Sequence, residues 1–147
     1  MEEIEFKTIR PSDKGFFDIY NEVLSWDDNH TYFPNTDHKE DFDLYNLIQT
    51  GVICYYKDEL IGYGTMTHFS NTNISYIINP KYRGQGYGKK LVEYLISRSY
   101  RKYGASCTIN AEILKDNIES ISLIESCDFS MDHSKDKTIV YTKKFEL

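Results

Sequence analysis

The middle of the chain reads Ile77-Ile78-Asn79-Pro80-Lys81-Tyr82-Arg83-Gly84-Gln85-Gly86-Tyr87-Gly88-Lys89-Lys90-Leu91-Val92. An apolar run and a proline come first, then three alternating glycines, then an amphipathic pattern that predicts a helix to about Tyr103. Glycines before a helix let an anion approach the unpaired N–H groups and partial positive charge of its first turn. Because Arg83, Lys89 and Lys90 add positive charge, the stretch predicts a diphosphate site.

Two better-known phosphate motifs do not fit this stretch. A P-loop needs G-x-x-x-x-G-K-[ST], but position 83 is Arg83 and Lys90 follows Gly88-Lys89. A dinucleotide fold needs G-x-G-x-x-G inside a parallel βαβ unit, whereas these glycines alternate after strands that we expect to be antiparallel. The pattern therefore argues against a nucleotide hydrolase and a dehydrogenase. A purely structural glycine turn stays open as an alternative.

The segments around this stretch alternate between strand and helix patterns. Period-two alternation and turn residues predict strands at residues 4–9, 52–57, 60–69, 74–78 and 105–113, with a closing hairpin at 129–134 and 138–145. Helical spacing predicts helices at residues 16–26, 42–48 and 117–127. We expect residues 52–78 to form an antiparallel meander, with a tight turn at Asp58-Glu59. The order indicates an α+β fold in which helices cover the faces of a sheet.

Composition limits the class of protein. A chain of 147 residues with 40% hydrophobic composition predicts one domain, residues 1–147. No apolar run reaches about 18 residues and the first residues are acidic, so we expect a cytoplasmic protein without a membrane segment. The spacing of cysteines and histidines predicts no metal site. A pI of about 5.2 argues against nucleic acid as a partner.

Charge is distributed unevenly along the chain. Residues 1–70 carry a net charge of −9 and residues 71–147 a net charge of +3. This asymmetry predicts a polyanion near the second half and a neutral or cationic partner near the first. Trp26 and Tyr32 stand among acidic residues of the first half, where they are candidate contacts for a cationic substrate. The other interpretation is that these aromatic residues pack beneath a solvated acidic surface.

Two motifs of the chain resemble those of the GNAT superfamily of N-acetyltransferases. Residues 77–92 look like its acetyl-CoA motif, in which a strand and a proline precede R/Q-x-x-G-x-G/A and a helix. Residues 117–129, NIESISLIESCDF, are similar to its later motif N-x-x-S/A-x-x-L-Y-E-x-x-G-F. The element order extends the resemblance over nearly the whole chain. It implies a three-layer α/β/α fold with a mixed, mostly antiparallel sheet of about seven strands, splayed between strands 4 and 5.

The resemblance implies an enzyme that transfers the acetyl group of acetyl-CoA to a primary amine of a small molecule or protein by direct attack. The backbone of Ile77 and Ile78 is expected to pair with the pantetheine arm, as an added strand pairs with a sheet edge. The amides from Gly84 to Lys89 are expected to hold the pyrophosphate, with Asn117 on the far side. The expected cofactor residues are Ile77, Ile78, Arg83, Gly84, Gln85, Gly86, Tyr87, Gly88, Lys89 and Asn117. The resemblance leaves the oligomeric state open, a homodimer included.

Acetyl transfer to an amine requires a base, an oxyanion donor and a proton donor for the departing thiolate. Glu112 is the expected base, because some relatives carry a glutamate at this distance before the asparagine that corresponds to Asn117. It lies on the strand face opposite Ile109, Ala111 and Ile113. A backbone N–H near Ile78 is the expected oxyanion donor.

The proton donor is where this chain departs from the family pattern. Many relatives carry a tyrosine as general acid at the position of Ile124, and isoleucine cannot donate a proton. Another tyrosine, such as Tyr76 or Tyr141, or a water molecule would have to take the role. Asp128 also replaces the usual glycine, and aspartate tolerates a left-handed helix end better than most residues. Two alternatives therefore stay open: a non-catalytic acyl-CoA-binding regulatory module, and a phosphate-binding protein that shares only the loop.

Overall fold

The computed structural model describes residues 4–10, 12–26, 49–68, 70–104 and 106–144. Within these residues the strands are β1 Ile4–Ile9, β2 Gln49–Tyr56, β3 Glu59–His68, β4 Thr72–Ile78, β5 Thr108–Leu114, β6 Ser130–Ser134 and β7 Thr138–Lys144. The helices are α1 Phe16–Leu24, α3 Tyr87–Tyr103, α4 Ile118–Ser126 and a 3-10 turn, Pro80–Tyr82. None of the helices in this described part combines the length and apolar composition needed to cross a bilayer.

The strands form one mixed sheet in the order β1-β2-β3-β4-β5-β7-β6. Strands β1 to β4 pair with antiparallel neighbours, which confirms the expected meander. The turn between β2 and β3 lies at Lys57-Asp58, one residue before the expected position, because both residues take positive φ values of 50° and 65°. Two left-handed residues match the right-handed twist of the flanking strands in a two-residue hairpin. The helix expected at residues 42–48 lies outside the described residues.

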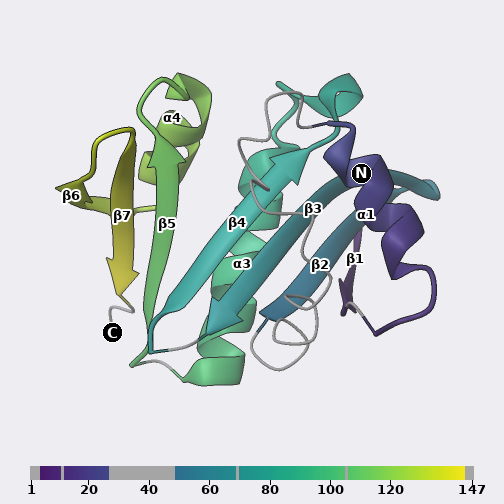
Figure 1. The fold of residues 1–147 in the computed structure, drawn as a ribbon, viewed down its shortest axis with the longest axis horizontal. Coiled ribbons are helices and arrows are strands. Elements are labelled where there is room, and N and C mark those ends of the chain that lie inside the picture. Colours follow the sequence, from purple (N-terminus) through teal and green to yellow (C-terminus); the bar gives the residue numbers. More distant parts are fainter. Residues whose placement is uncertain (1–3, 11, 27–48, 69, 105, 145–147) are drawn as a thin grey trace.

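β4 and β5 are parallel neighbours that pair only at one end. Thr72 lies opposite Ile109 and Asn73 opposite Asn110, and within the described residues no further pair follows. Beyond Asn73 the two strands diverge, and the gap widens toward the start of α4 (Figure 1). The splay between strands 4 and 5 that the resemblance implied is therefore confirmed.

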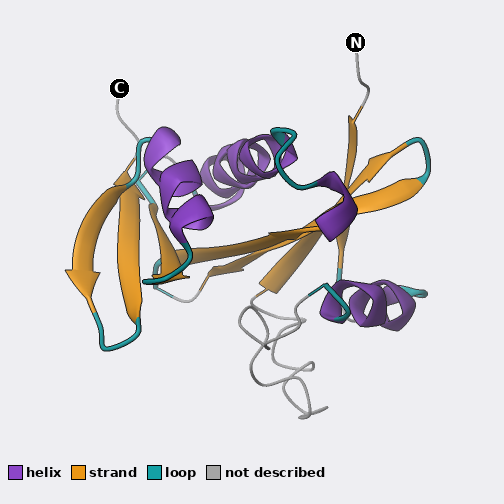
Figure 2. Cartoon of the chain, turned by 90° about the horizontal axis from the view of Figure 1, so that it is seen from above, coloured by secondary structure: helices purple, strands orange, loops and turns teal. Residues whose placement is uncertain are grey.

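Helices cover both faces of the sheet, as the three-layer expectation requires. α3 and α4 lie on one face and α1 on the other (Figure 2). Under α3 and α4, fully buried side chains such as Leu91, Leu95 and Ile124 pack against β4 and β5. On the other face, Phe16 and Trp26 pack against β3 and β4. The sheet thus separates two apolar clusters.

α3 approaches β3 closely because β3 carries two glycines beneath it. A Cβ on Gly64 would lie 2.8 Å from the Leu95 Cδ1 atom, and one on Gly62 would lie 3.2 Å from the Leu91 Cδ2 atom. A larger residue at either position would push the helix away from the sheet. Since the glycine-rich loop leads directly into α3, this packing also fixes where the loop lies.

Candidate active site

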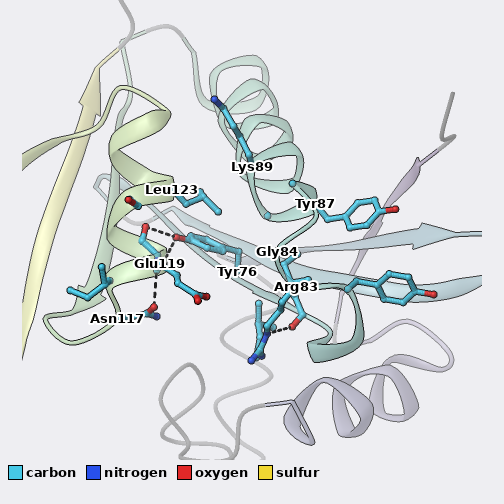
Figure 3. A pocket seen from close by; sticks show the side chains of 16 residues that line it. Tyr76, Arg83, Gly84, Tyr87, Lys89, Asn117, Glu119 and Leu123 are labelled. Atoms are coloured by element: carbon cyan, nitrogen blue, oxygen red, sulfur yellow. Dashed lines mark hydrogen bonds between the residues drawn. The ribbon is translucent and has the colours of Figure 1, made fainter.

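A cavity of about 480 Å³ opens at the N-terminus of α3 (Figure 3). Its lining residues come from three segments: residues 76–78 of β4, residues 82–89 of the loop and the first turn of α3, and residues 117–123 at the start of α4. The cavity therefore occupies the open end of the splay. All the expected cofactor residues line it except Gln85, which is exposed in the loop. Their role in holding a cofactor stays a prediction.

The loop holds backbone N–H groups at the cavity. Gly84 and Gly86 take φ values of 77° and 89°, and Gly86 is the N-cap residue of α3. A Cβ on either glycine would meet nothing within 4 Å, so their requirement is conformational and not steric. No side chain accepts a hydrogen bond at the N-cap of α3 in the described structure, so no capping side chain holds the N–H groups of the first turn.

Arg83 has a structural role in addition to its charge. Its Nε atom donates a hydrogen bond to the Ile78 carbonyl oxygen at 3.0 Å, and its Nη2 atom donates to the Trp26 carbonyl oxygen at 3.3 Å. The Arg83 side chain thereby ties the end of β4 to Trp26, just after α1, and Figure 3 shows the bond to Ile78. Lys89 and Lys90 are exposed on the first turn of α3 and add charge there.

The opposite wall is the first turn of α4. The Asn117 Oδ1 atom accepts a hydrogen bond from the Ser120 backbone N–H at 3.2 Å and so caps the helix. The Ser120 hydroxyl is hydrogen-bonded to the Tyr76 hydroxyl, which reaches it from β4. The sequence pointed to Tyr76 only as one alternative, and it did not point to Ser120. The three-residue spacing from Asn117 to Ser120, which is typical of a helix start, was the available signal.

Ile124 and Tyr141, the two positions discussed for the proton donor besides Tyr76, both lie in the core. Ile124 is fully buried in the cluster under α3 and α4. Tyr141 is buried in the same cluster, from β7. Neither is among the described residues that line the cavity. Asp128 has a φ of 67°, the left-handed conformation expected where relatives carry glycine.

Glu112 lies on the outer face of β5 and does not line the cavity among the described residues. Its Oε1 atom accepts a hydrogen bond from Lys135 Nζ at 3.0 Å, and its Oε2 atom accepts one from Thr138 Oγ1 at 2.9 Å. The contact with Lys135, supported by Thr138, lowers the pKa of the Glu112 carboxyl group. The structure thus does not bring Glu112 together with the loop, and its role as base stays a prediction.

Trp26 and Tyr32 are the two candidate substrate contacts. Trp26 is only 8% exposed and packs in the cluster beneath α1, although its carbonyl group binds Arg83. Tyr32 lies outside the described residues. A role of either side chain in binding an acceptor stays a prediction.

The profile of the Acetyltransferase (GNAT) family matches residues 14–129. The chain belongs to this family, as its motifs predicted. Comparison with curated protein sequences finds no match.

Solved structures of the same fold cover nearly the whole chain. Ribosomal-protein-S5-alanine acetyltransferase from Vibrio fischeri is 14% identical, with a TM-score of 0.77 over 99% of this chain and 95% of that one. Campylobacter jejuni N-acetyltransferase PseH, in complex with acetyl coenzyme A, is 13% identical, with a TM-score of 0.74 over 98% of this chain and 100% of that one. A Bacillus subtilis acetyltransferase in complex with CoA is 17% identical, with a TM-score of 0.71 over 99% of this chain and 100% of that one. At these identities the likeness establishes the fold.

Proposed function

We propose that the chain is an N-acetyltransferase that transfers the acetyl group of acetyl-CoA to a primary amine of a small molecule or a protein by direct attack. The observation that carries the proposal is the cavity joining the α3 N-terminus, the diverging end of β4 and the start of α4. Family membership and the relatives solved with acetyl-CoA or CoA support it. In this proposal residues 1–147 act as one domain of a cytoplasmic enzyme.

The cavity suits an extended cofactor that ends in a diphosphate. Its volume lies within the range of about 300–1,000 Å³ common for ligand sites. We place the pyrophosphate on the amides from Gly84 to Lys89, where the helix terminus and Lys89 favour negative charge. The pantetheine arm would run along Ile77 and Ile78, on the edge of β4 that faces β5, which is unpaired there among the described residues. Asn117 would contact it from α4.

Bound acetyl-CoA supplies a thioester, and the residues of this chain determine how an amine reaches it. With the cofactor on the side of α3 and α4, the amine would enter the splay from the face of α1, the face to which Glu112 belongs. Glu112 would remove the proton of the ammonium group, after release from Lys135. A backbone N–H near Ile78 would stabilise the oxyanion.

The proposal is tested by measuring CoA release from acetyl-CoA over a panel of small amines and peptides. We expect CoA release that depends on one class of amine and saturates with it. Calorimetry should show CoA binding that ATP displaces only weakly, because ATP lacks the pantetheine arm. If ATP displaced CoA readily, a phosphate-binding protein that shares only the loop would be the better description.

A second function is favoured by two observations. Ile124 is buried at the position of the tyrosine acid of many relatives, and Glu112 is engaged by Lys135. Both fit a regulatory module that binds acyl-CoA without catalysis. Such a module would bind CoA in calorimetry and release none from acetyl-CoA with any amine in the panel.

The role of Glu112 is tested by Glu112→Gln, which removes the base but retains its size. We expect kcat to fall about tenfold with unchanged CoA affinity. This is less than the roughly 10²–10⁴-fold typical of general bases, because a carboxylate of lowered pKa is a weak base. Lys135→Ala is the matched variant. Because Lys135 lowers the pKa of Glu112, removing it should move the acid limb of the kcat/KM profile to higher pH. An unchanged rate in Glu112→Gln would remove Glu112 from the mechanism.

A further inference from the structure

One phenol group lies at the point where β4 and β5 separate. Tyr76 follows the last β4 residue that pairs with β5 by three positions, and its ring lies on the face of α3 and α4. The side chain is only 8% exposed, yet it lines the cavity. Figure 3 shows the ring crossing from β4 toward α4, with its hydroxyl group at the first turn of that helix. The oxygen is therefore held inside the splay and away from bulk water.

Ser120 determines the direction of this phenol. The backbone N–H of Ser120 donates to the Asn117 side chain that caps α4, which fixes the backbone position from which the Ser120 side chain extends. The two hydroxyl groups are hydrogen-bonded, and either oxygen can be the donor. The Tyr76 hydroxyl also lies 3.5 Å from the Ser120 carbonyl oxygen, a weak contact at that distance. When the Ser120 hydroxyl donates to Tyr76, the phenol proton faces the Ser120 carbonyl oxygen at 3.5 Å and can turn from this long contact to a ligand in the cavity.

We propose that Tyr76 is the general acid of this enzyme and that it replaces the tyrosine absent at Ile124. The inference rests on the proposed function. The amine nitrogen forms a bond to the acetyl carbon and loses one proton to the base. As the carbon–sulfur bond breaks, its electron pair goes to sulfur, which takes the phenol proton of Tyr76. The phenolate then regains a proton from water. The ammonium group loses two protons in all, one to the base and one to water, and the thiol gains one, so that one proton is released to solvent in each turnover.

The other phenols at the cavity are directed elsewhere. Tyr82 donates its hydroxyl hydrogen bond to Glu59, and this contact raises the pKa of Tyr82. The Tyr87 ring packs edge-on against Tyr82, at 5.9 Å between ring centroids, and points away from α4 (Figure 3). Of the tyrosines that line the cavity, Tyr76 is thus the one that reaches into the splay. Ser120 acts through Tyr76 and is a positioning residue.

The test compares Tyr76→Phe with wild type at saturating acetyl-CoA and amine. We expect kcat to fall about tenfold, which is less than the roughly 10²–10⁴-fold typical of a general acid, because a thiolate is a good leaving group. Wild type should lose kcat at alkaline pH as its acid ionises, and Tyr76→Phe should lack that limb. The charged groups lining the same cavity, Arg83, Lys89 and Glu119, are the same in both proteins and cannot produce the difference. Ser120→Ala should lower kcat less than Tyr76→Phe does. Ser120→Thr should have a kcat close to that of wild type, because threonine keeps the hydroxyl group.

Tyr141→Phe is the matched control, because Tyr141 is similarly buried in the same cluster but does not line the cavity in the described structure. It should leave kcat and the alkaline limb unchanged. CoA affinity and melting temperature report whether each variant is folded. If wild type acetylates an amine and Tyr76→Phe keeps its rate and its alkaline limb, the role of Tyr76 is overturned while the proposed function stands. If wild type itself acetylates no amine, the proposed function is overturned and this role with it.

Discussion

We expect Gly86→Val to raise the Kd for CoA about 100-fold while the chain still folds. Gly86 has a φ of 89°, where a residue with a Cβ is strained by about 1–2 kcal/mol. Gly86 lines the cavity and a Cβ there would meet nothing within 4 Å, so a valine side chain would enter the space that we propose for the pyrophosphate. Charge-assisted hydrogen bonds contribute about 1.5–3 kcal/mol each, and losing one or two corresponds to roughly two orders of magnitude in Kd. Calorimetry with CoA measures the change.

Gly15→Val is the control for backbone strain. Gly15 is the N-cap residue of α1, with φ and ψ of 85° and −2°, against 89° and 0° for Gly86. A Cβ there would also meet nothing within 4 Å, and Gly15 does not line the cavity. Both variants should lose a similar free energy of unfolding, but only Gly86→Val should lose CoA affinity. Equal affinity in the two variants would place the diphosphate elsewhere.

We expect Leu95→Ala to lower the free energy of unfolding by about 3 kcal/mol. Leu95 is fully buried between α3 and β3, and removal of such a side chain leaves a cavity that rigid neighbours do not fill. Denaturant unfolding followed by circular dichroism measures the loss. An effect below about 1 kcal/mol would mean that α3 can move onto the sheet and close the space.

The space at Leu95 can be filled from the opposite side. A Cβ on Gly64 would lie 2.8 Å from the Leu95 Cδ1 atom and 3.1 Å from the Ser75 carbonyl oxygen, so Gly64→Ala alone should destabilise the protein. In the double variant the new methyl group enters the space that the leucine leaves. We expect the double variant to be more stable than the sum of single effects predicts, by about 1 kcal/mol. Simple additivity would contradict direct packing between these two positions.

Local patterns predicted most of the fold because its elements are locally regular. The strand at residues 4–9 and the helix to Tyr103 end where expected, since Gly104 stops the helix and contact with the sheet fixes the strand. The misplaced hairpin turn has a specific cause. Lysine is not among the residues that favour a left-handed conformation, so the sequence does not predict one at Lys57. The hairpin imposes that conformation on both Lys57 and Asp58.

Local pattern alone predicted the site only where one segment builds it, and the family resemblance added Asn117 on a second segment. The loop from Arg83 to Lys89 is contiguous, and its glycines and charges indicate an anion site without knowledge of the fold. The contact between Tyr76 and Ser120 joins residues 44 positions apart, and it exists only because β4 and β5 diverge. Likewise, no local pattern shows that Lys135 contacts Glu112, because that contact depends on pairing between β5 and β7.

The short pairing between β4 and β5 has a mechanical consequence. Within the described sheet, these two residue pairs join the block β1 to β4 to the block β5 to β7. Thr72 at this junction is fully buried, and its hydroxyl is hydrogen-bonded to His68 Nδ1 at 2.9 Å, which anchors the apex. A rotation of one block against the other would pivot at these two pairs, and the displacement would grow toward the open ends of β4 and β5. Such a rotation would widen or narrow the cavity between β4 and α4 without breaking a strand pair.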